Sequence, residues 1–461
     1  MEYQNKQVLI IGLARSGLGA ARLLLHHGAM VTICDSKKEE NLKADVLAEA
    51  AAMPVRLLFG TTPDEELLQR YDLMILSPGV PTDLPFVLKA RELGLTIWGE
   101  VELAYRFCKA PIIGITGTNG KTTTTALTGE IMKAAYPGTE VVGNIGIAFA
   151  LRAEVPTEDD YVVAELSSFQ LETIEAFHPH ISAILNITPD HLNRHHTMQA
   201  YMEAKQNVYR NQTEEDFCVL NFDDPECLRM AEELKNRLHG PQIIGFSRKS
   251  RPEGGIWTED GEIVSGIGGV RQSIVKIDDM KIFGAHNEEN MLAAIACCLC
   301  AGLDPEVIRD AAVQFQGVAH RIEYVGTVNE VPYYNDSKAT NTDAAIKGLL
   351  AMRSQVVLIG GGMDKKIPFD PWTDLMPGRV KKLLLIGETK EIIRDAALRS
   401  GLEADKIEFC DTLDETVQKA RQYAQPGDCV LLSPACASWD MFESFEQRGD
   451  LFRSAVQALQ A

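Results

Sequence analysis

Apolar, often β-branched runs alternate along nearly the whole chain with segments whose apolar residues recur at helical spacing. The stretch "QVLIIGLARSGLGAARLLLHHGAMVTICD" predicts a strand, a glycine turn, a helix and a second strand. Later runs such as "APIIGIT", "YVVAE", "QVVLIGG" and "CVLLSP" repeat the strand pattern, and helical patterns follow them. This alternation predicts an α/β protein with mostly parallel sheets.

The length of 461 residues suggests about three domains at roughly 150 residues each. We place the boundaries near residues 99 and 317. The predicted domains are therefore 1–99, Rossmann-like; 100–317, a central P-loop ATPase-like parallel sheet; and 318–461, a second Rossmann-like α/β domain.

The composition excludes several classes of protein. The formal net charge is −20, and no cluster of Lys and Arg resembles a nucleic-acid footprint. Any anionic ligand must therefore be held by a few local cations, backbone N–H groups or metal ions. The N-terminus lacks a basic region before its apolar run, so it predicts a first strand and not a signal peptide.

The ten cysteines do not follow a disulfide-scaffold pattern. Cys297 and Cys300 have C-x-x-C spacing within "MLAAIACCLCAGL", which is too short to span a bilayer and suits a buried helix. Core thiols are the favoured interpretation, with metal or redox chemistry as the alternative. We expect a reducing cytoplasm, no membrane insertion and a monomer.

The segment "GITGTNGKTTTT" carries the strongest chemical signal. A glycine-rich turn between a strand and a helix presents successive N–H groups to an anion, Lys121 supplies charge for the outer phosphates, and Thr122 offers a hydroxyl to Mg²⁺. Ile115 departs from the strict P-loop pattern, yet "TGTNGKT" predicts a nucleoside triphosphate site. The predicted contacts with ATP are Gly117, Thr118, Asn119, Gly120, Lys121, Thr122 and Thr123.

The central domain also offers metal ligands. Glu165 and His191 each end a predicted strand, and a carboxylate with a hydroxyl suits Mg²⁺. His191 and His195 have a zinc-like spacing, but a third ligand is lacking and we disfavour zinc.

The first domain carries "GLARSG" where a dinucleotide fingerprint would lie, with Asp35 at the end of the next strand. Ala14 replaces the second glycine, so its methyl group lies where a pyrophosphate would approach the backbone. A ligand-free turn, a nicotinamide or flavin site, and a site for another nucleotide remain open on this pattern alone.

Several motifs occur together and in order: "GITGTNGKTTT", "VGNIG", "ELSSFQL", "PDHLNRH", "AHNEEN", "HRIE", "NDSKATN" and "LLSPACASWD". Together they resemble the Mur ligase family over all three blocks. "NDSKATN", "LLSPACAS" and the short first domain with "SPG" resemble the branch that adds D-glutamate to UDP-N-acetylmuramoyl-L-alanine. The resemblance implies synthesis of the peptidoglycan precursor, hence roles in cell-wall biogenesis, cell shape and cell division.

The resemblance assigns roles to individual residues. It implies that the UDP substrate contacts Arg15, Ser16, Asp35, Ser36, Lys37, Ser77, Gly79 and Asn144. It implies a pair of Mg²⁺ ions held by Thr122, Glu165, His191 and Lys205, the last as a carbamate formed with CO₂. The helical pattern around Lys205 alone predicts a solvated lysine. The implied catalytic residues are Lys121, His191, Lys205 and Lys338.

Further ATP contacts are implied for Asn287, Asn290, Arg321 and Asp336. Asn287 and Asn290 lie three apart and hence on one helix face, and a helix cap is the alternative interpretation. The D-glutamate contacts implied are Thr340, Lys365, Ser438 and Phe445. Trp439 stands beside Ser438 where a smaller aliphatic residue was expected.

The chemistry implied is amide synthesis through an acyl phosphate, with ATP as the activating substrate. The alternatives are another amino-acid-adding Mur-type ligase, a folylpolyglutamate synthase-like enzyme, or, in a different class, a P-loop kinase or nucleotide switch.

Overall fold

The computed structural model describes residues 3–144 and 146–459. The chain forms two compact units. The first runs from the N-terminus to Met280 and continues over Glu288–Val313, and the second comprises Lys281–Asn287 and Gln314 to the C-terminus. The predicted α/β class with parallel-rich sheets is confirmed. The domain boundaries at 99 and 317 stay a prediction.

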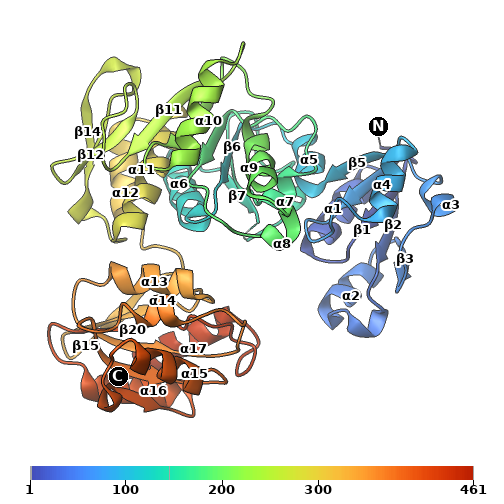
Figure 1. Ribbon diagram of the computed structural model, residues 1–461. Helices are drawn as coiled ribbons and strands as arrows, with labels where there is room; N and C mark the ends of the chain where they lie inside the picture. The colour runs from blue at the N-terminus through green and yellow to red at the C-terminus, as the bar shows by residue number, and fades with distance from the viewer. Residues whose placement is uncertain (1–2, 145, 460–461) are drawn as a thin grey trace. The chain divides into compact units, whose positions relative to one another are not determined.

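The first sheet of the first unit has five parallel strands in the order β3-β2-β1-β4-β5, the blue part of Figure 1. Its strands are β1 (Gln7–Ile11), β2 (Met30–Asp35), β3 (Arg56–Phe59), β4 (Leu73–Leu76) and β5 (Thr96–Gly99). Its helices are α1 (Arg15–His26), η1 (Glu39–Asn41), α2 (Ala44–Ala51), α3 (Glu65–Leu68) and α4 (Pro85–Glu92). This order places the carboxyl ends of β1, β2 and β4 at one edge, where ligands bind in open α/β sheets.

The central sheet has nine strands in the order β14-β13-β12-β11-β10-β9-β6-β8-β7. Its strands are β6 (Ile112–Thr116), β7 (Glu140–Gly143), β8 (Val162–Glu165), β9 (Ile181–Ile184), β10 (Phe217–Asn221), β11 (Gln242–Ser247), β12 (Ile256–Glu259), β13 (Glu262–Ser265) and β14 (Gln272–Lys276). The pairings are parallel from β7 to β12, and β13 and β14 add antiparallel strands at one edge.

The helical segments around this sheet include short ones that carry site residues. They are α5 (Glu100–Tyr105), α6 (Lys121–Ala135), η2 (Phe149–Leu151), α7 (Ser168–Leu171), α8 (Leu192–His195), α9 (Met198–Gln206), η3 (Asn207–Tyr209), α10 (Pro225–Lys235), η4 (Ile267–Gly269), η5 (Ile277–Asp279), α11 (Ala285–Cys300) and α12 (Pro305–Gln314). Strand β6 is buried at every position, since helices cover both faces of this part of the sheet.

The second unit contains a six-stranded sheet in the order β15-β16-β20-β17-β18-β19, in which only the β15–β16 pair is antiparallel. Its strands are β15 (Glu323–Val328), β16 (Val331–Asn335), β17 (Val356–Gly360), β18 (Val380–Leu385), β19 (Ile407–Phe409) and β20 (Cys429–Leu432). Its helices are α13 (Thr342–Ala351), α14 (Asp370–Thr373), α15 (Lys390–Arg399), η6 (Ala404–Lys406), α16 (Leu413–Tyr423) and α17 (Phe445–Ala458).

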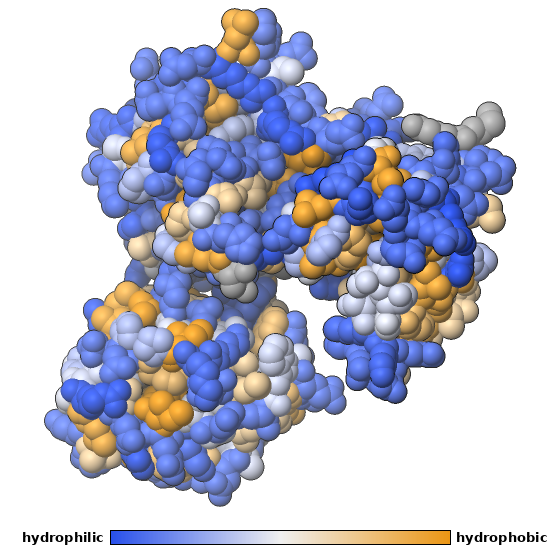
Figure 2. Space-filling model, turned by 45° about the vertical axis from the view of Figure 1, so that its right-hand side comes forward, coloured by the Kyte–Doolittle hydropathy of each residue, from blue (hydrophilic) through white to orange (hydrophobic). Residues whose placement is uncertain are grey.

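The ten cysteines are free thiols, nine of them buried and Cys108 partly buried. Cys297, Cys298 and Cys300 lie inside α11, and burial raises the pKa of each thiol. The interpretation of this helix as a core element is confirmed. Among the described helices, none is both long and apolar enough to cross a bilayer. The face drawn in Figure 2 is mostly hydrophilic, and apolar residues appear on it in separate patches.

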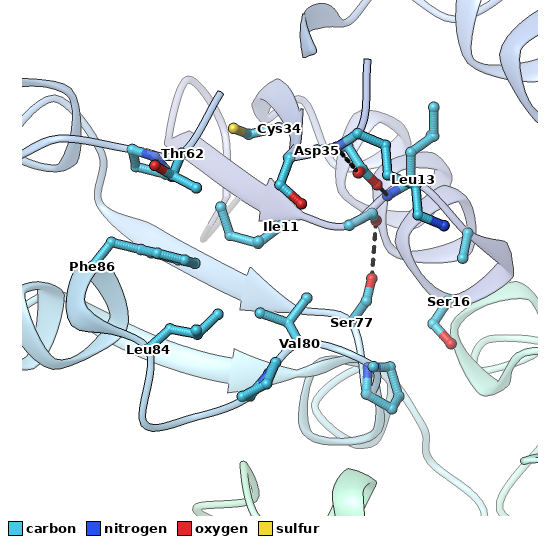
Figure 3. A pocket seen from close by; sticks show the side chains of 18 of the residues that line it. Ile11, Leu13, Ser16, Cys34, Asp35, Thr62, Ser77, Val80, Leu84 and Phe86 are labelled. Carbon is cyan, nitrogen blue, oxygen red and sulfur yellow. Dashed lines mark hydrogen bonds between the residues drawn. The ribbon is translucent and has the colours of Figure 1, made fainter. Parts of the chain in front are cut away.

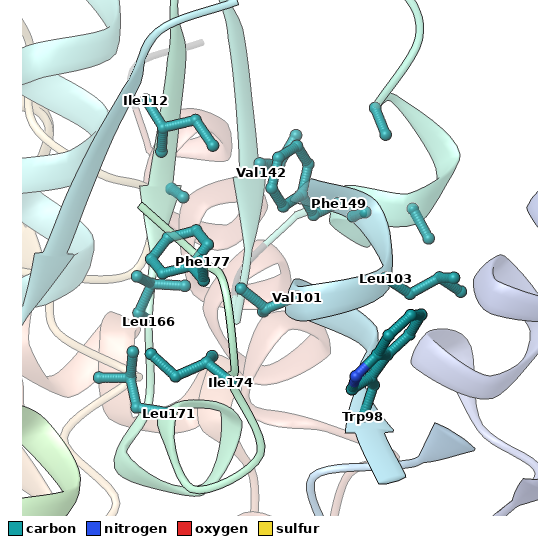
Figure 4. Close-up of a cluster of buried hydrophobic side chains, with 14 of the residues drawn as sticks. Trp98, Val101, Leu103, Ile112, Val142, Phe149, Leu166, Leu171, Ile174 and Phe177 are labelled. Atoms are coloured by element: carbon teal, nitrogen blue, oxygen red, sulfur yellow. The ribbon is translucent and has the colours of Figure 1, made fainter. Parts of the chain in front are cut away.

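One apolar core joins the first two sheets through α5. Val101 and Leu103 are fully buried and belong to the same cluster as Phe149 and Phe177 of the central domain (Figure 4). Two carboxylates on α5 reinforce this joint. Glu102 accepts hydrogen bonds of 2.8–3.0 Å from the consecutive backbone N–H groups of residues 175–177. These contacts replace water for a side chain that is 0% exposed.

Glu100 is the second buried carboxylate of α5. Its Oε1 accepts a 2.6 Å hydrogen bond from the Ala150 N–H, whereas Oε2 is buried with no hydrogen-bond partner. Burial raises the pKa of Glu100 from its ordinary value of 4.5 to about 7. Between these two pH values the folded chain retains a proton that the unfolded chain has lost. The contribution of Glu100 to stability therefore falls as pH rises through this window.

We expect Glu100→Gln to remove this pH dependence, because glutamine keeps an acceptor for Ala150 but cannot ionise. Relative to the wild type, the free energy of unfolding of the variant should rise by up to about 3 kcal/mol between pH 5 and pH 8. Urea denaturation followed by circular dichroism at several pH values measures the difference. A difference that is the same at every pH would show that ionisation of Glu100 plays no part.

Candidate active site

The glycine-rich loop that is predicted to bind phosphate follows β6, and its shape depends on two glycines. Gly117 and Gly120 have φ angles of 146° and 87°, which disfavour side chains. A Cβ atom at residue 120 would lie 2.2 Å from Asn290 Oδ1, so the loop backbone packs directly against α11. Asn186, after β9, accepts from the Asn119 N–H at 2.8 Å and donates to the Asn119 carbonyl at 3.1 Å.

Two lysines converge on one backbone oxygen of this loop. Lys121 Nζ donates to the Gly117 carbonyl at 2.9 Å and to the Thr118 carbonyl at 2.8 Å. Lys205 Nζ, from α9, donates to the same Gly117 carbonyl at 2.7 Å. Lys205 is 1% exposed, so the solvated lysine that its helical pattern predicts is wrong. Burial, and then repulsion by Lys121, hold the pKa of Lys205 well below its ordinary value.

The predicted metal ligands Thr122 and Glu165 are both buried. Glu165 ends β8, and its Oε1 accepts a 2.8 Å hydrogen bond from Asn144 Nδ2. Its Oε2 is buried with no hydrogen-bond partner, which is costly for a carboxylate unless a cation faces it. The Thr123 hydroxyl, next to Thr122, is also buried without a partner. This donor set of hard oxygens fits Mg²⁺.

His191 precedes α8 and His195 is its last residue, and the two side chains have different surroundings. His191 precedes the helix with a φ angle of 54°, and its side chain is 49% exposed. His195 is buried, with Nε2 2.9 Å from Ser168 Oγ and Nδ1 3.2 Å from Glu172 Oε1. Because both ring nitrogens of His195 have protein partners, the zinc pair stays disfavoured. Phe169 lies against both imidazole rings, at centroid distances of 4.9 and 5.4 Å.

A cavity of about 1080 Å³ lies at the carboxyl edge of the first sheet (Figure 3). Every residue predicted to contact the UDP substrate lines it: Arg15, Ser16, Asp35, Ser36, Lys37, Ser77, Gly79 and Asn144. The volume is slightly above the usual range for small-molecule sites, about 300–1,000 Å³. The central domain contributes Gly143, Asn144, Ala148 and Gln170 to its wall. Asn144 therefore lines the cavity and also binds Glu165.

Asp35 lines this cavity and accepts hydrogen bonds from two backbone N–H groups. Its Oδ2 accepts from the Leu13 N–H at 2.8 Å, and its Oδ1 accepts from the Lys37 N–H at 2.9 Å. Ser77 Oγ donates to the Gly12 carbonyl at 2.9 Å, which joins the loops after β1 and β4 (Figure 3). Each carboxylate oxygen of Asp35 retains acceptor capacity for a ligand N–H group.

Arg194 links the cavity to the helix that follows His191, a connection that the sequence does not reveal. Its Nη2 donates to the Val80 carbonyl at 3.1 Å and to Glu172 Oε2 at 2.7 Å. Val80 lines the cavity. Arg194 and Glu172 are mostly buried, with side chains 12% and 14% exposed, so this pair is less screened than a surface ion pair.

In the second unit, Asp336 is 4% exposed. Its carboxylate accepts from Ser433 Oγ at 2.8 Å and from the Ile322 N–H at 3.3 Å. Burial raises the pKa of Asp336 to about 7, while the neighbouring Arg321 and Arg448 act in the opposite direction. The Arg321 Nε atom is buried with no hydrogen-bond partner, and Lys338 Nζ lies 5.7 Å from the Phe445 ring centroid.

Of the predicted D-glutamate residues, Lys365 and Thr340 meet directly. Lys365 Nζ is 3.4 Å from Thr340 Oγ1, and burial lowers the pKa of Lys365. Ser438 is 2% exposed, whereas its neighbour Trp439 is 68% exposed. Phe445 begins α17.

Arg448 was missed by the sequence analysis, and it organises these loops. It is fully buried and donates to the Ser337 side chain at 2.9 Å and the Ser337 carbonyl at 2.8 Å. It also donates to the carbonyls of Cys436 and Ala437, at 3.2 and 3.4 Å. Desolvation lowers the pKa of its guanidinium to about 10. The arginine thereby ties the loop after β16 to the loop after β20.

A lysine-bearing glycine loop before a helix occurs in enzymes that use nucleoside triphosphates, and the separate cavity provides for a second substrate. The geometry is that of this class of enzyme, and comparison with known proteins identifies the family within the class. Family models match residues 6–99 (Mur ligase MurD-like, N-terminal domain), 115–298 (Mur ligase middle domain) and 320–436 (Mur ligase, glutamate ligase domain).

Curated relatives match the full length of the chain. Those from Thermoanaerobacter sp. (strain X514) and Alkaliphilus oremlandii (strain OhILAs) are each 46% identical, with 100% of both chains covered. Both are named UDP-N-acetylmuramoylalanine--D-glutamate ligase. The chain belongs to the Mur ligase family, whose members are ATP-dependent, amide-forming ligases that use Mg²⁺.

Solved structures share the fold at lower identity. The UDP-N-acetylmuramate-alanine ligase MurC of Thermotoga maritima has a TM-score of 0.61 and 19% identity, covering 98% of this chain and 100% of its own. MurF of Acinetobacter baumannii has a TM-score of 0.60 and 18% identity, with coverages of 98% and 93%.

We expect Arg194→Ala to loosen the cavity wall around Val80 without unfolding the chain. A hydrogen bond to a charged group is worth about 1.5–3 kcal/mol, so amide exchange at Val80 should accelerate roughly tenfold or more. Hydrogen–deuterium exchange measures this effect. Arg152→Ala is the matched control, because Arg152 pairs with Glu140 at 3.8 Å elsewhere in the same unit. Equal rates of amide exchange at Val80 in both variants would contradict the role of Arg194 in holding the cavity wall.

Proposed function

We propose that the chain joins D-glutamate to UDP-N-acetylmuramoyl-L-alanine, with cleavage of ATP to ADP and phosphate. The observation that carries the proposal is the position of Asn144. Its side chain lines the large cavity and donates to Glu165 beside the phosphate-binding loop. A nucleotide-sugar substrate that fills the cavity can thereby present its far end to the loop that holds ATP.

The first domain is proposed to hold the UDP end of that substrate. Asp35 can accept from the uracil N3–H, in a pocket that Ser36 and Lys37 also line. Arg15 and Ser16 would contact the diphosphate, to which Arg15 offers positive charge. Arg15 and Lys37 line the cavity of a chain whose net charge is −20. Their attraction for the anionic substrate is local, whereas the repulsion from distant negative charges is screened. The names of the full-length relatives support this choice of substrate.

In the central domain, the phosphates of ATP are proposed to lie on the backbone N–H groups of the loop from Gly117 to Thr123. In that state Lys121 can exchange its two carbonyl partners for phosphate oxygens, which are stronger acceptors because they are charged. Thr122, Glu165 and His191 would hold Mg²⁺, which neutralises phosphate charge when bound.

Activation of the acceptor is the chemical reason for ATP. A carboxylate does not acylate an amine directly, because its oxygens are poor leaving groups. The alanyl carboxylate is proposed to attack the γ-phosphorus, which releases ADP and forms an acyl phosphate. The amine of D-glutamate then attacks the acyl carbon, and inorganic phosphate leaves as the amide forms. Lys121 lowers the repulsion between the attacking anion and the polyphosphate.

The second unit is proposed to supply the amino-acid contacts. Lys365 and Thr340, which already meet, would bind the α-carboxylate, and Ser438 and Phe445 the side-chain end. Arg448 supports the proposal because it holds the loops that carry these residues in one arrangement. Asn287, Asn290, Arg321, Asp336 and Lys338 remain proposed ATP contacts.

The function is tested by measuring ADP release with UDP-N-acetylmuramoyl-L-alanine and a panel of amino acids. We expect turnover with D-glutamate and little with L-glutamate, and a loss of at least about 10²-fold in Lys121→Met, because one electrostatic donor at such a site is worth that much. Preference for another amino acid, or for a folate acceptor, would replace the substrate assignment. ATP turnover without amide would indicate a kinase or nucleotide switch.

Lys205 is proposed to carry a carbamate. Only a neutral amine attacks CO₂, and burial beside Lys121 depresses the pKa of Lys205 in the direction that supplies this form. The reaction forms an N–C bond and releases one proton, which converts a hydrogen-bond donor into an anionic oxygen ligand. An anion at this position would also relieve the repulsion from Lys121.

We expect protein incubated with ¹³C-bicarbonate to show a carbamate carbonyl resonance by NMR. The resonance should be absent from Lys205→Gln and should weaken as the pH falls, since protonation of the amine competes with its reaction with CO₂. Lys235→Gln is the control, because Lys235 is exposed and paired with Glu232. A labelled spectrum that is unchanged in Lys205→Gln would rule out a carbamate at this residue.

A further inference from the structure

Helix α1 ends at His26, His27 follows as its C-cap, and a carboxylate from the central domain lies beside both. One ligand atom each from His26, His27 and Glu154 can be chosen so that all lie within 4.8 Å of one another. His27 Nε2 is 2.9 Å from Glu154 Oε1, and the two imidazole centroids are 5.2 Å apart. In the described part of the chain, no other group of three His, Cys, Asp or Glu side chains is gathered this closely.

The donor set selects a different class of metal from the Mg²⁺ site. Two imidazoles and one carboxylate suit Zn²⁺ and neighbouring transition metals, whereas Mg²⁺ prefers oxygen ligands throughout. Ligands about 2.0–2.2 Å from a tetrahedral Zn²⁺ lie roughly 3.3 Å from one another. The observed separations, from 2.9 Å between His27 and Glu154 up to at most 4.8 Å, lie on either side of this value.

The surroundings favour a bound cation. The histidines lie at the C-terminal end of α1, which is the negative end of the helix dipole. His26 and Glu154 are exposed, so a metal ion can enter and retain a water ligand. The His27 ring packs against Phe107, at a centroid distance of 4.3 Å, which restricts its orientation before a metal arrives.

We propose that His26, His27 and Glu154 form a binding site for a divalent transition metal of the Zn²⁺ class, separate from the catalytic centre. The site would connect α1 to the central domain. At the other end of α1, Arg15 Nη1 donates to the Gly146 carbonyl at 2.7 Å. Between these ends Gly19 packs closely on η2, where an added Cβ would lie 3.3 Å from Leu151 Cγ. Metal binding would therefore hold the C-terminal end of α1 against the central domain, while the N-terminal end of α1 lines the substrate cavity.

The proposal is tested by titrating Zn²⁺ into the full-length protein against a chromophoric chelator, with Mg²⁺ in excess to occupy the oxygen-rich site. The variants are His26→Ala and Glu154→Gln, and His239→Ala is the matched control. His239 also pairs with a glutamate, at 3.2 Å from Glu214, but without a third ligand. Circular dichroism verifies that each variant is folded.

The wild type and His239→Ala should each bind one Zn²⁺. The affinity of His26→Ala and Glu154→Gln for this ion should be lower by at least about tenfold, because loss of even an outer-shell partner reduces metal affinity by this factor. Zn²⁺ should also slow amide exchange at the C-terminal end of α1 in the wild type and not in Glu154→Gln. Equal Zn²⁺ affinity and stoichiometry in all four proteins would overturn the proposal. So would Zn²⁺ binding that leaves exchange in α1 unchanged.

Discussion

The Gly117 carbonyl oxygen is the point on which the candidate active site depends. Lys121 and Lys205 both donate to it, in a place from which water is largely excluded. Two protonated amines repel each other at such a site, and burial together with this repulsion holds the pKa of Lys205 well below its ordinary value. The left-handed conformations at Gly117 and Gly120 make this convergence possible, because they turn the backbone toward both lysines.

The packing of the first domain against the central domain is the second interaction on which the candidate site depends. Glu102 binds three consecutive N–H groups of the central domain, and Val101 and Leu103 fill one core with Phe149 and Phe177. The cavity spans the same joint, so its shape is defined only when the two sheets are held together. Arg194 and Asn144 extend this connection to the helix after His191 and to Glu165. The cavity is therefore in direct contact with Glu165 and with α8.

Much of this organisation can be predicted from the sequence, because its signals are local. The loop from Gly117 to Lys121 has its residues adjacent in the chain, and the residues that follow β1, β2 and β4 must meet because parallel strands end at one edge. The remaining contacts join distant segments. No role is predicted from the sequence for Arg194, Glu172 or Arg448, and only folding brings them to their partners. Lys205 shows the limit most clearly, because its helical pattern predicts exposure and the structure buries it.

The burial of the cysteines has a consequence for how the chain meets oxidants and electrophiles. Every thiol has a raised pKa, even that of the partly buried Cys108, so almost no thiolate is present in the folded state. At the nine buried cysteines, reaction of the sulfur therefore requires local opening of the chain. The alkylation rate of a buried cysteine thus reports how often the structure around it unfolds locally. The buried thiols are therefore probes of local unfolding in both units.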